Sequence, residues 1–103
     1  MAEESNLKRE CREVIEHGLN GRLIQVGAKS WNGFPDSILF IPGCPSVFIE
    51  FKAKGKKPRT NQSKWGEWLK DNHFHYWLID DFDQFNESVE NLLLDHNPRS
   101  KGC

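Results

Sequence analysis

The sequence predicts a single mixed α/β (α+β) domain with a central sheet flanked by helices, and three observations lead to this prediction. The chain has 103 residues, which suits one compact core rather than two. Two runs of β-branched and aromatic residues flank a short segment rich in Pro and Gly, which is the pattern of a β-hairpin. Segments with apolar residues at helical spacing stand before and after these runs. We therefore predict one domain over residues 1–103, with a loose tail from about residue 97.

The predicted order of elements is helix, three strands, helix, strand, helix. The first helix has apolar positions at helical spacing and a stop at Asn20-Gly21. The second has Thr60 or Asn61 as its cap and, as its buried stripe, the side chains of Trp65, Trp68 and Leu69. The predicted helices cover residues 7–19, 60–71 and about 83–95, and the predicted strands cover residues 22–26, 37–41, 47–51 and 74–79.

The net charge is −1, but the charges are separated along the chain. Residues 52–70 carry seven basic side chains against Glu67 alone, whereas residues 80–95 are acidic without a basic neighbour. The basic flank can hold phosphates and the acidic flank repels them. We expect DNA contacts from the basic residues Lys54, Lys56, Lys57, Arg59 and Lys64.

The sequence also bears on the compartment. It has no run of about 20 apolar residues that would span a membrane, and its first residues lack the pattern of a secretory signal. Cys11, Cys44 and Cys103 are odd in number and form no Cys-x-x-Cys pair, which argues against a disulfide framework and a thiolate zinc site. We expect a cytoplasmic protein, without membrane or organic small-molecule partners, in a bacterial or phage-infected cell.

The hairpin carries the residues that indicate chemistry. If its loop centres on Gly43-Cys44, residues whose numbers sum to about 87 or 88 lie opposite, so that Asp36 faces Phe51 or Lys52 and lies beside Glu50. Side chains alternate along a strand, so Glu50 and Lys52 share one face while Phe51 points into the core. Two carboxylates and an amine should therefore meet on one patch.

A divalent cation would compensate the burial of these carboxylates. Carboxylate oxygens from Asp36 and Glu50, with the main-chain carbonyl of Phe51, suit Mg²⁺ or Mn²⁺. Lys52 could orient a water or stabilise developing charge. The alternative is an ordinary Glu–Lys pair with a turn-associated Asp, but a charged residue in the apolar run around Glu50 is hard to explain structurally.

These motifs resemble a known family. Gly33-Phe34-Pro35-Asp36, then Val47-Phe48-Ile49-Glu50-Phe51-Lys52, then Gln62, are similar to the VRR-NUC (virus-type replication-repair nuclease) group of the PD-(D/E)XK superfamily. The resemblance implies a restriction-endonuclease-like core, metal ligation by Asp36 and Glu50, a catalytic Lys52 and a functional Gln62. It also implies an acidic residue on the first helix that assists the metal; Glu10 is the candidate, with Glu13 and Glu16 as competitors. A basic residue is expected near Gln25, and whether Lys29 replaces it is open.

The resemblance implies a metal-dependent DNA endonuclease. Short stand-alone members suggest a homodimer that cuts branched DNA such as four-way (Holliday) junctions, as in DNA repair. Flaps, single strands or duplex ends are alternative substrates, and a catalytically silent DNA-binding module and an interaction protein are alternative functions. His73 and His75 could share a strand face and suit zinc, but no third ligand has the right spacing. Most aromatic residues are expected in the core, and Trp31 is the exception that could stack on a base.

Overall fold

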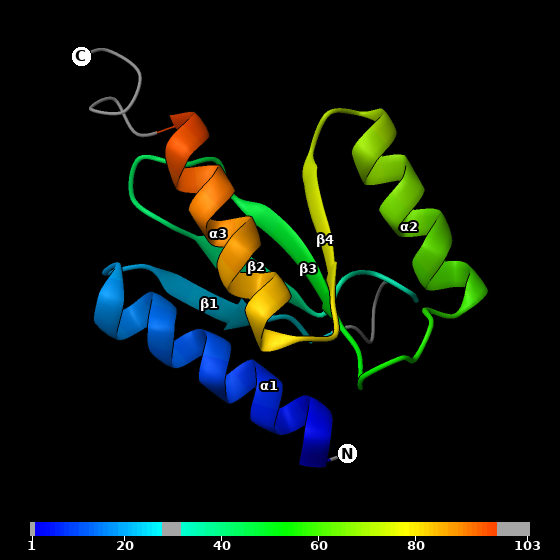
Figure 1. The fold of residues 1–103 in the computed structure, drawn as a ribbon. Helices are drawn as coiled ribbons and strands as arrows, with labels where there is room; N and C mark the ends of the chain where they lie inside the picture. The colour runs from blue at the N-terminus through cyan, green and yellow to red at the C-terminus, as the bar shows by residue number, and fades with distance from the viewer. Residues whose placement is uncertain (1, 28–31, 97–103) are drawn as a thin grey trace.

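The structure is a computed structural model that describes residues 2–27 and 32–96, and within them it has three α-helices and a four-stranded mixed sheet (Figure 1). The predicted fold class and order of elements are confirmed. Lys29, Trp31 and the tail from residue 97 lie outside the described residues. The elements are α1 (Ala2–Glu13), the π-helical turn η1 (Val14–Gly18), β1 (Arg22–Gln25), β2 (Ser37–Phe40), β3 (Val47–Phe51), α2 (Thr60–Asp71), β4 (His75–Ile79) and α3 (Phe82–His96).

The four strands follow their order in the chain across the sheet. The pairs β1–β2 and β2–β3 are antiparallel, whereas β3 and β4 are parallel and are joined by a crossover through α2. The parallel pairing brings the ends of β3 and β4 to the same edge, where Lys52 N donates to Ile79 O at 2.9 Å. This edge, together with the start of β2, carries the candidate site residues.

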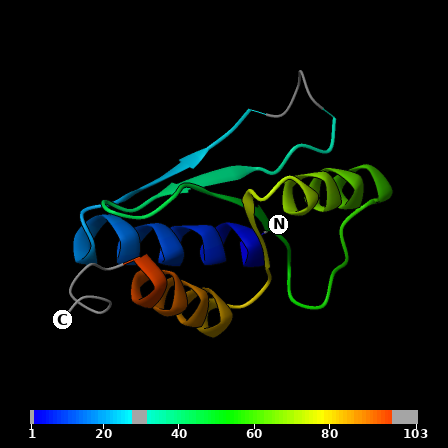
Figure 2. The ribbon, with the colours of Figure 1, turned by 90° about the horizontal axis from the view of Figure 1, so that it is seen from above.

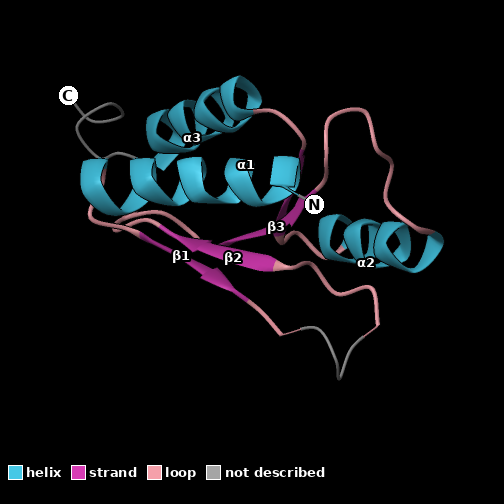
Figure 3. Cartoon of the chain, turned by 90° about the horizontal axis from the view of Figure 1, so that it is seen from below, coloured by secondary structure: helices cyan, strands magenta, loops and turns pink. Residues whose placement is uncertain are grey.

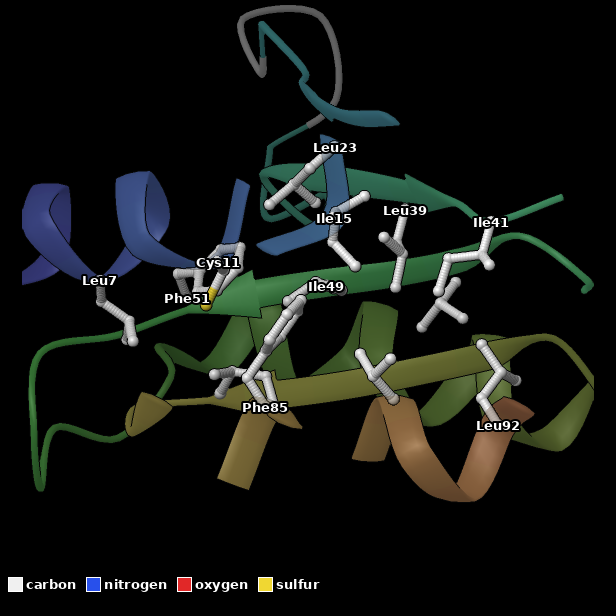
Figure 4. Close-up of a cluster of buried hydrophobic side chains, with 13 residues drawn as sticks. Leu7, Cys11, Ile15, Leu23, Leu39, Ile41, Ile49, Phe51, Phe85 and Leu92 are labelled. Atoms are coloured by element: carbon white, nitrogen blue, oxygen red, sulfur yellow. The ribbon is translucent and has the colours of Figure 1, made fainter. Parts of the chain in front are cut away.

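The helices lie on opposite faces of the sheet. α1 and α3 lie side by side on one face, and α2 packs against β4 on the other (Figure 2 and Figure 3). Side chains of alternate strand residues meet α1 and α3 in the core, which Figure 4 shows. Its members are Leu7, Cys11, Ile15, Leu23, Leu39, Ile41, Val47, Ile49, Phe51, Ile79, Phe85, Val89 and Leu92.

The first helix begins earlier than expected, at Ala2 rather than residue 7. The residues before Leu7 are mostly polar and gave no apolar periodicity, which is why the sequence pattern missed them. A Lys8–Glu4 ion pair of 3.3 Å at i,i+4 spacing supports this early turn. The extra turns carry α1 to the edge of the sheet where β3 ends.

Two expectations about α2 are wrong. Its N-cap is Arg59 rather than Thr60 or Asn61. Its buried side chains are Gln62 and Leu69 together with Gly66, whereas Trp65 is half-buried and Trp68 is 52% exposed. The cause is the close approach at Gly66, where a Cβ would meet the Tyr76 ring at 2.7 Å. α2 therefore contacts β4 along a line that leaves the tryptophans at its margin.

The described residues bear on two expectations, one about membrane-spanning segments and one about the cysteine thiols. None of the helices in residues 2–27 and 32–96 is long and apolar enough to cross a membrane. Cys11 and Cys44 carry free thiols, and burial raises the pKa of Cys11 to about 12. Cys11 is therefore an unreactive part of the core.

Candidate functional site

The hairpin register brings Asp36 opposite Glu50. Ser37 pairs with Ile49, so continuing the ladder by one residue sets Asp36 across from Glu50. The paired numbers sum to 86 rather than 87 or 88, and the predicted register was wrong by one or two residues. The reason lies in the turn, where Cys44 N donates to Ile41 O at 3.0 Å and Gly43 has a φ of 85°, so the turn centres one residue early.

Asp36 is held by three donors. Ser37 Oγ donates to Oδ1 at 2.9 Å, and Phe51 N donates to Oδ2 at 3.3 Å. Lys8 Nζ from α1 lies 3.6 Å from the same Oδ2. Burial raises the pKa of Asp36, and the charge of Lys8 and the two hydrogen bonds oppose this rise.

Glu50 is more deeply buried, with 3% of its surface exposed. Its Oε2 accepts a hydrogen bond from Gln62 Nε2 at 3.0 Å and lies 3.6 Å from Lys52 Nζ. Its Oε1 is buried and has no hydrogen-bond partner among the described residues. Burial, followed by the nearby charge of Asp36, raises the pKa of Glu50 to about 7. The site thus contains two carboxylates that repel each other, and one oxygen of Glu50 is an unsatisfied acceptor.

Gln62 lies at the start of α2, where two contacts fix its amide. Its Oε1 accepts from Arg59 N at 2.9 Å, which leaves Nε2 directed to Glu50. The partner of Nε2 in the structure is the Glu50 carboxylate. Gln62 therefore joins the helix cap to the carboxylate pair.

The α1 residues at the site differ from those expected. Glu10 is exposed and lines a cleft of about 410 Å³ with Lys52, on which Asp80 and Asp81 also border. Lys8 reaches Asp36, and the charge of Glu4 raises the pKa of both Asp36 and Glu50. Glu4 was missed because the predicted helix began at residue 7, and Lys8 was missed because its contact with Asp36 is a tertiary one.

The competing first-helix candidates and the zinc hypothesis lie elsewhere. Glu13 and Glu16 are exposed and follow Glu10 along the helix, farther from the edge that carries Asp36. His73 stands in the turn before β4 with a φ of 68°, and His75 packs on His96 with ring centroids 5.9 Å apart. The two histidines therefore do not share a strand face as expected.

The basic residues after β3 are mostly exposed. Lys54 Nζ contacts Asp81 Oδ1 at 3.0 Å, and Gly55 N donates to Asp80 Oδ2 at 3.1 Å. The basic segment is therefore tethered to the acidic residues just before α3, although the two segments are far apart in the sequence. The exposed side chains among the expected DNA contacts are Lys54, Lys56, Lys57, Arg59 and Lys64.

The donor set fits a hard divalent cation. Asp36 and Glu50 offer carboxylate oxygens, and Glu50 Oε1 is a buried acceptor that a cation would satisfy. Within residues 2–27 and 32–96 no three His, Cys, Asp or Glu side chains gather into a group that could hold a metal ion. Mg²⁺ commonly rests on one or two carboxylates and keeps several waters, so two carboxylates meet its usual requirement.

Solved structures share this architecture. One, titled "VRR_NUC domain", matches with a TM-score of 0.77 and 21% identity over 85% of this chain and 95% of its own. The chain has the fold of a VRR_NUC domain. A second structure with the VRR_NUC fold, titled "VRR_NUC domain protein", matches with a TM-score of 0.70 and 16% identity over 87% of each chain. No family model matches the sequence, and no curated protein matches it significantly. The resemblance to the VRR_NUC group is thus confirmed at the level of the fold.

Proposed function

We propose that this protein is a nuclease that uses Mg²⁺ or Mn²⁺ to hydrolyse phosphodiester bonds in DNA. The observation that carries the proposal is the desolvated Asp36–Glu50 pair beside Lys52, with Glu50 Oε1 lacking a hydrogen-bond partner among the described residues. Buried carboxylates of this kind either keep a proton or are neutralised by a cation, so this pair is suited to holding a metal ion. The likeness to VRR_NUC structures supports a nuclease.

Each residue has a role in this proposal. Asp36 and Glu50 would hold the ion, with the main-chain carbonyl of Phe51 as a further ligand. A bound divalent ion would lower the pKa of a water and neutralise charge on the scissile phosphate. Lys52 Nζ would donate to a non-bridging phosphate oxygen, and Gln62 would keep Glu50 Oε2 oriented.

Charged residues of α1 would change the electrostatic environment of the Asp36–Glu50 pair. Glu4, rather than Glu10, has the acidic charge that acts on both carboxylates, so we propose Glu4 as the assisting acidic residue. Glu10, on the other side of Lys52, would border the path of the substrate through the cleft. Lys8 would offset the charge of Asp36 when no metal is bound.

The proposed substrate is branched DNA cut by a homodimer. A 12.0 kDa domain with one site cuts one strand, so two coordinated cuts need a two-fold dimer. The exposed Lys56, Lys57, Arg59 and Lys64 supply phosphate contacts beside the site. Flaps, single strands and duplex ends are the alternative substrates.

Cleavage assays in Mg²⁺ and Mn²⁺ test the proposal, with four-way junctions, flaps, single strands and linear duplexes compared side by side. We expect metal-dependent cutting that Asp36→Ala and Lys52→Ala reduce by at least about 100-fold. Glu13→Gln, which changes an exposed carboxylate on α1, is the control and should cut normally. Binding without cleavage in either metal would instead identify a DNA-binding module.

A further inference from the structure

A chain of aromatic rings lies beside the carboxylate pair and is partly open to solvent. Trp65 contacts Phe34 and Trp68 with ring centroids 5.0 and 6.0 Å apart, and Trp68 stacks on Phe74 at 6.0 Å with an interplanar angle of 18°. Trp68 is 52% and Phe74 is 48% exposed. We call Trp65, Trp68 and Phe74 the aromatic platform.

The platform is hollowed and has a basic rim. A shallow pocket of about 240 Å³ is lined by Trp65, Trp68 and the exposed Lys64. Glu67, the acidic residue between Trp65 and Trp68 in the sequence, lines a different pocket with Lys70 and Tyr76. The charge at the rim of the platform pocket is therefore positive, and the other lining residues are the two tryptophans.

The platform lies outside the main buried cluster. The buried cluster forms between the sheet and helices α1 and α3, whereas α2 lies on the other face of the sheet (Figure 3). Exposed ring faces gathered around a pocket mark a binding surface more often than isolated exposed apolar residues do. A ligand that combines a flat ring with a negative charge would match both the rings and Lys64.

The platform is also close to the proposed reaction. Gln62 contacts Glu50, and Trp65 and Trp68 follow it by three and six residues on the same helix. A helix rises about 1.5 Å per residue, so the two rings start about 4.5 and 9 Å farther along its axis. At about 3.4 Å per base step, this separation spans about one to three nucleotides.

We propose that the aromatic platform binds an unpaired nucleobase by stacking, with Lys64 contacting the adjoining phosphate. The inference rests on the proposed nuclease function and narrows its substrate to DNA with an unpaired base near the cut. Bases within an intact duplex are stacked on their neighbours and cannot offer a free face to Trp68. The platform would thus select strands that are locally open.

The first test measures binding without cleavage. The full-length protein in EDTA is titrated with a short oligothymidylate and with an abasic strand of the same length, and tryptophan fluorescence is followed. We expect quenching by oligothymidylate and much weaker binding of the abasic strand. Trp68→Ala should weaken oligothymidylate binding by about 5- to 150-fold, and Trp68→Tyr should restore most of it.

The control is Leu94→Ala, which removes an equally exposed apolar side chain from α3, away from α2. It should bind oligothymidylate as the unaltered protein does. Equal binding of the abasic strand, or full binding by a folded Trp68→Ala variant, would overturn the proposal. A Trp68→Ala variant that loses self-association but keeps DNA binding would also overturn it, because the platform would then be a protein interface.

The second test separates this inference from the proposed function. In Mg²⁺ or Mn²⁺, Trp68→Ala should reduce the rate of cleavage of strands with unpaired bases more than it reduces the rate of cleavage of paired DNA. Absence of cleavage by the unaltered protein in either metal would contradict the nuclease but leave the EDTA binding result intact. Equal loss on paired and unpaired substrates would contradict the stacking role while the nuclease stands.

Discussion

Glu50 is the residue at which burial and charge oppose each other most strongly. One oxygen is shared by Gln62 and Lys52, and the other has no partner among the described residues. Burial and the charge of Asp36 raise its pKa to about 7, from 4.5 for an ordinary Glu. The carboxyl group is therefore costly to ionise in the folded protein when no cation is bound.

The raised pKa predicts a pH dependence of stability in EDTA. Between pH 4.5 and about 7 the folded protein keeps the Glu50 proton that the unfolded chain has lost. The native state then binds more protons, so the free energy of unfolding falls as pH rises through this range. We expect the Tm of the unaltered protein to fall relative to that of Glu50→Gln between pH 5 and pH 8.

Other groups titrate in the same range, so the comparison depends on the difference between variants. Glu13→Gln, with an exposed carboxyl group, should follow the unaltered protein at every pH. The quantity to follow is the Tm of the unaltered protein minus the Tm of Glu50→Gln. If this difference stays flat or rises with pH, Glu50 is already ionised at pH 5.

Lys8 predicts a second effect at the residue scale. Its ammonium lies 3.6 Å from Asp36 Oδ2 and competes there with an incoming cation. Lys8→Gln should therefore bind Mn²⁺ more tightly, by up to about fivefold, as calorimetric titration would measure. Arg9→Gln removes an exposed charge from the next position of α1 and should leave the affinity nearly unchanged. Weaker binding by Lys8→Gln would show that Lys8 supports the metal site.

At the scale of elements, Gly33 joins the loop before β2 to the start of α2. It has a φ of 86°, and a Cβ there would meet the Asn61 backbone at 2.7 Å. Asp36 follows Gly33 by three residues, and Gln62 follows Asn61 directly on α2. The Gly in the Gly33-Phe34-Pro35-Asp36 motif therefore has a packing role that the motif alone does not reveal.

Gly33→Ala and Gly43→Ala form a matched pair. Gly43 has a similar φ of 85° but open space around its Cβ position. An L-residue at positive φ costs about 1–2 kcal/mol, so both variants should lose stability in thermal unfolding. Gly33→Ala should lose more, and it should also reduce cleavage because α2 is displaced with Gln62. Equal losses in both would exclude a specific role for the contact with Asn61.

The sequence predicted elements well where their signal is local. The β2–β3 hairpin and α3 follow directly from β-branched runs and helical spacing, and both were found near their predicted bounds. The polar start of α1 was missed because it has no apolar periodicity, and the exposure of Trp68 was missed because it depends on a tertiary contact. Lys8 of α1 contacts Asp36, and Gly66 sets the contact line of α2. The hairpin pattern is local, so it correctly placed Asp36 beside Glu50. The contact of Gln62 with Glu50 and the position of Glu10 depend on how the helices pack on the sheet, which the sequence pattern does not reveal.

At the scale of the whole molecule, one chain carries one carboxylate pair. Coordinated cutting of two strands therefore predicts a dimer of the 12.0 kDa chain. Sedimentation equilibrium at the concentration of the cleavage assay should give about twice the chain mass. A monomer mass that accompanies paired cuts in a junction would contradict the dimer and leave single-strand cutting as the activity.

The placement of α2 has a consequence for the motions of the molecule. Among the described elements, α2 packs on β4 and reaches β3 through the hydrogen bond from Gln62 to Glu50, while α1 and α3 share the main core. Local opening of α2 would withdraw Gln62 from Glu50 without melting the rest of the domain. Amide hydrogens of α2 should therefore exchange with deuterium sooner than those of α1 and α3, and a bound cation or DNA strand should slow them. The proposed active site would then be complete only while α2 is folded against the sheet, because α2 supplies Gln62 and is also the helix expected to open first.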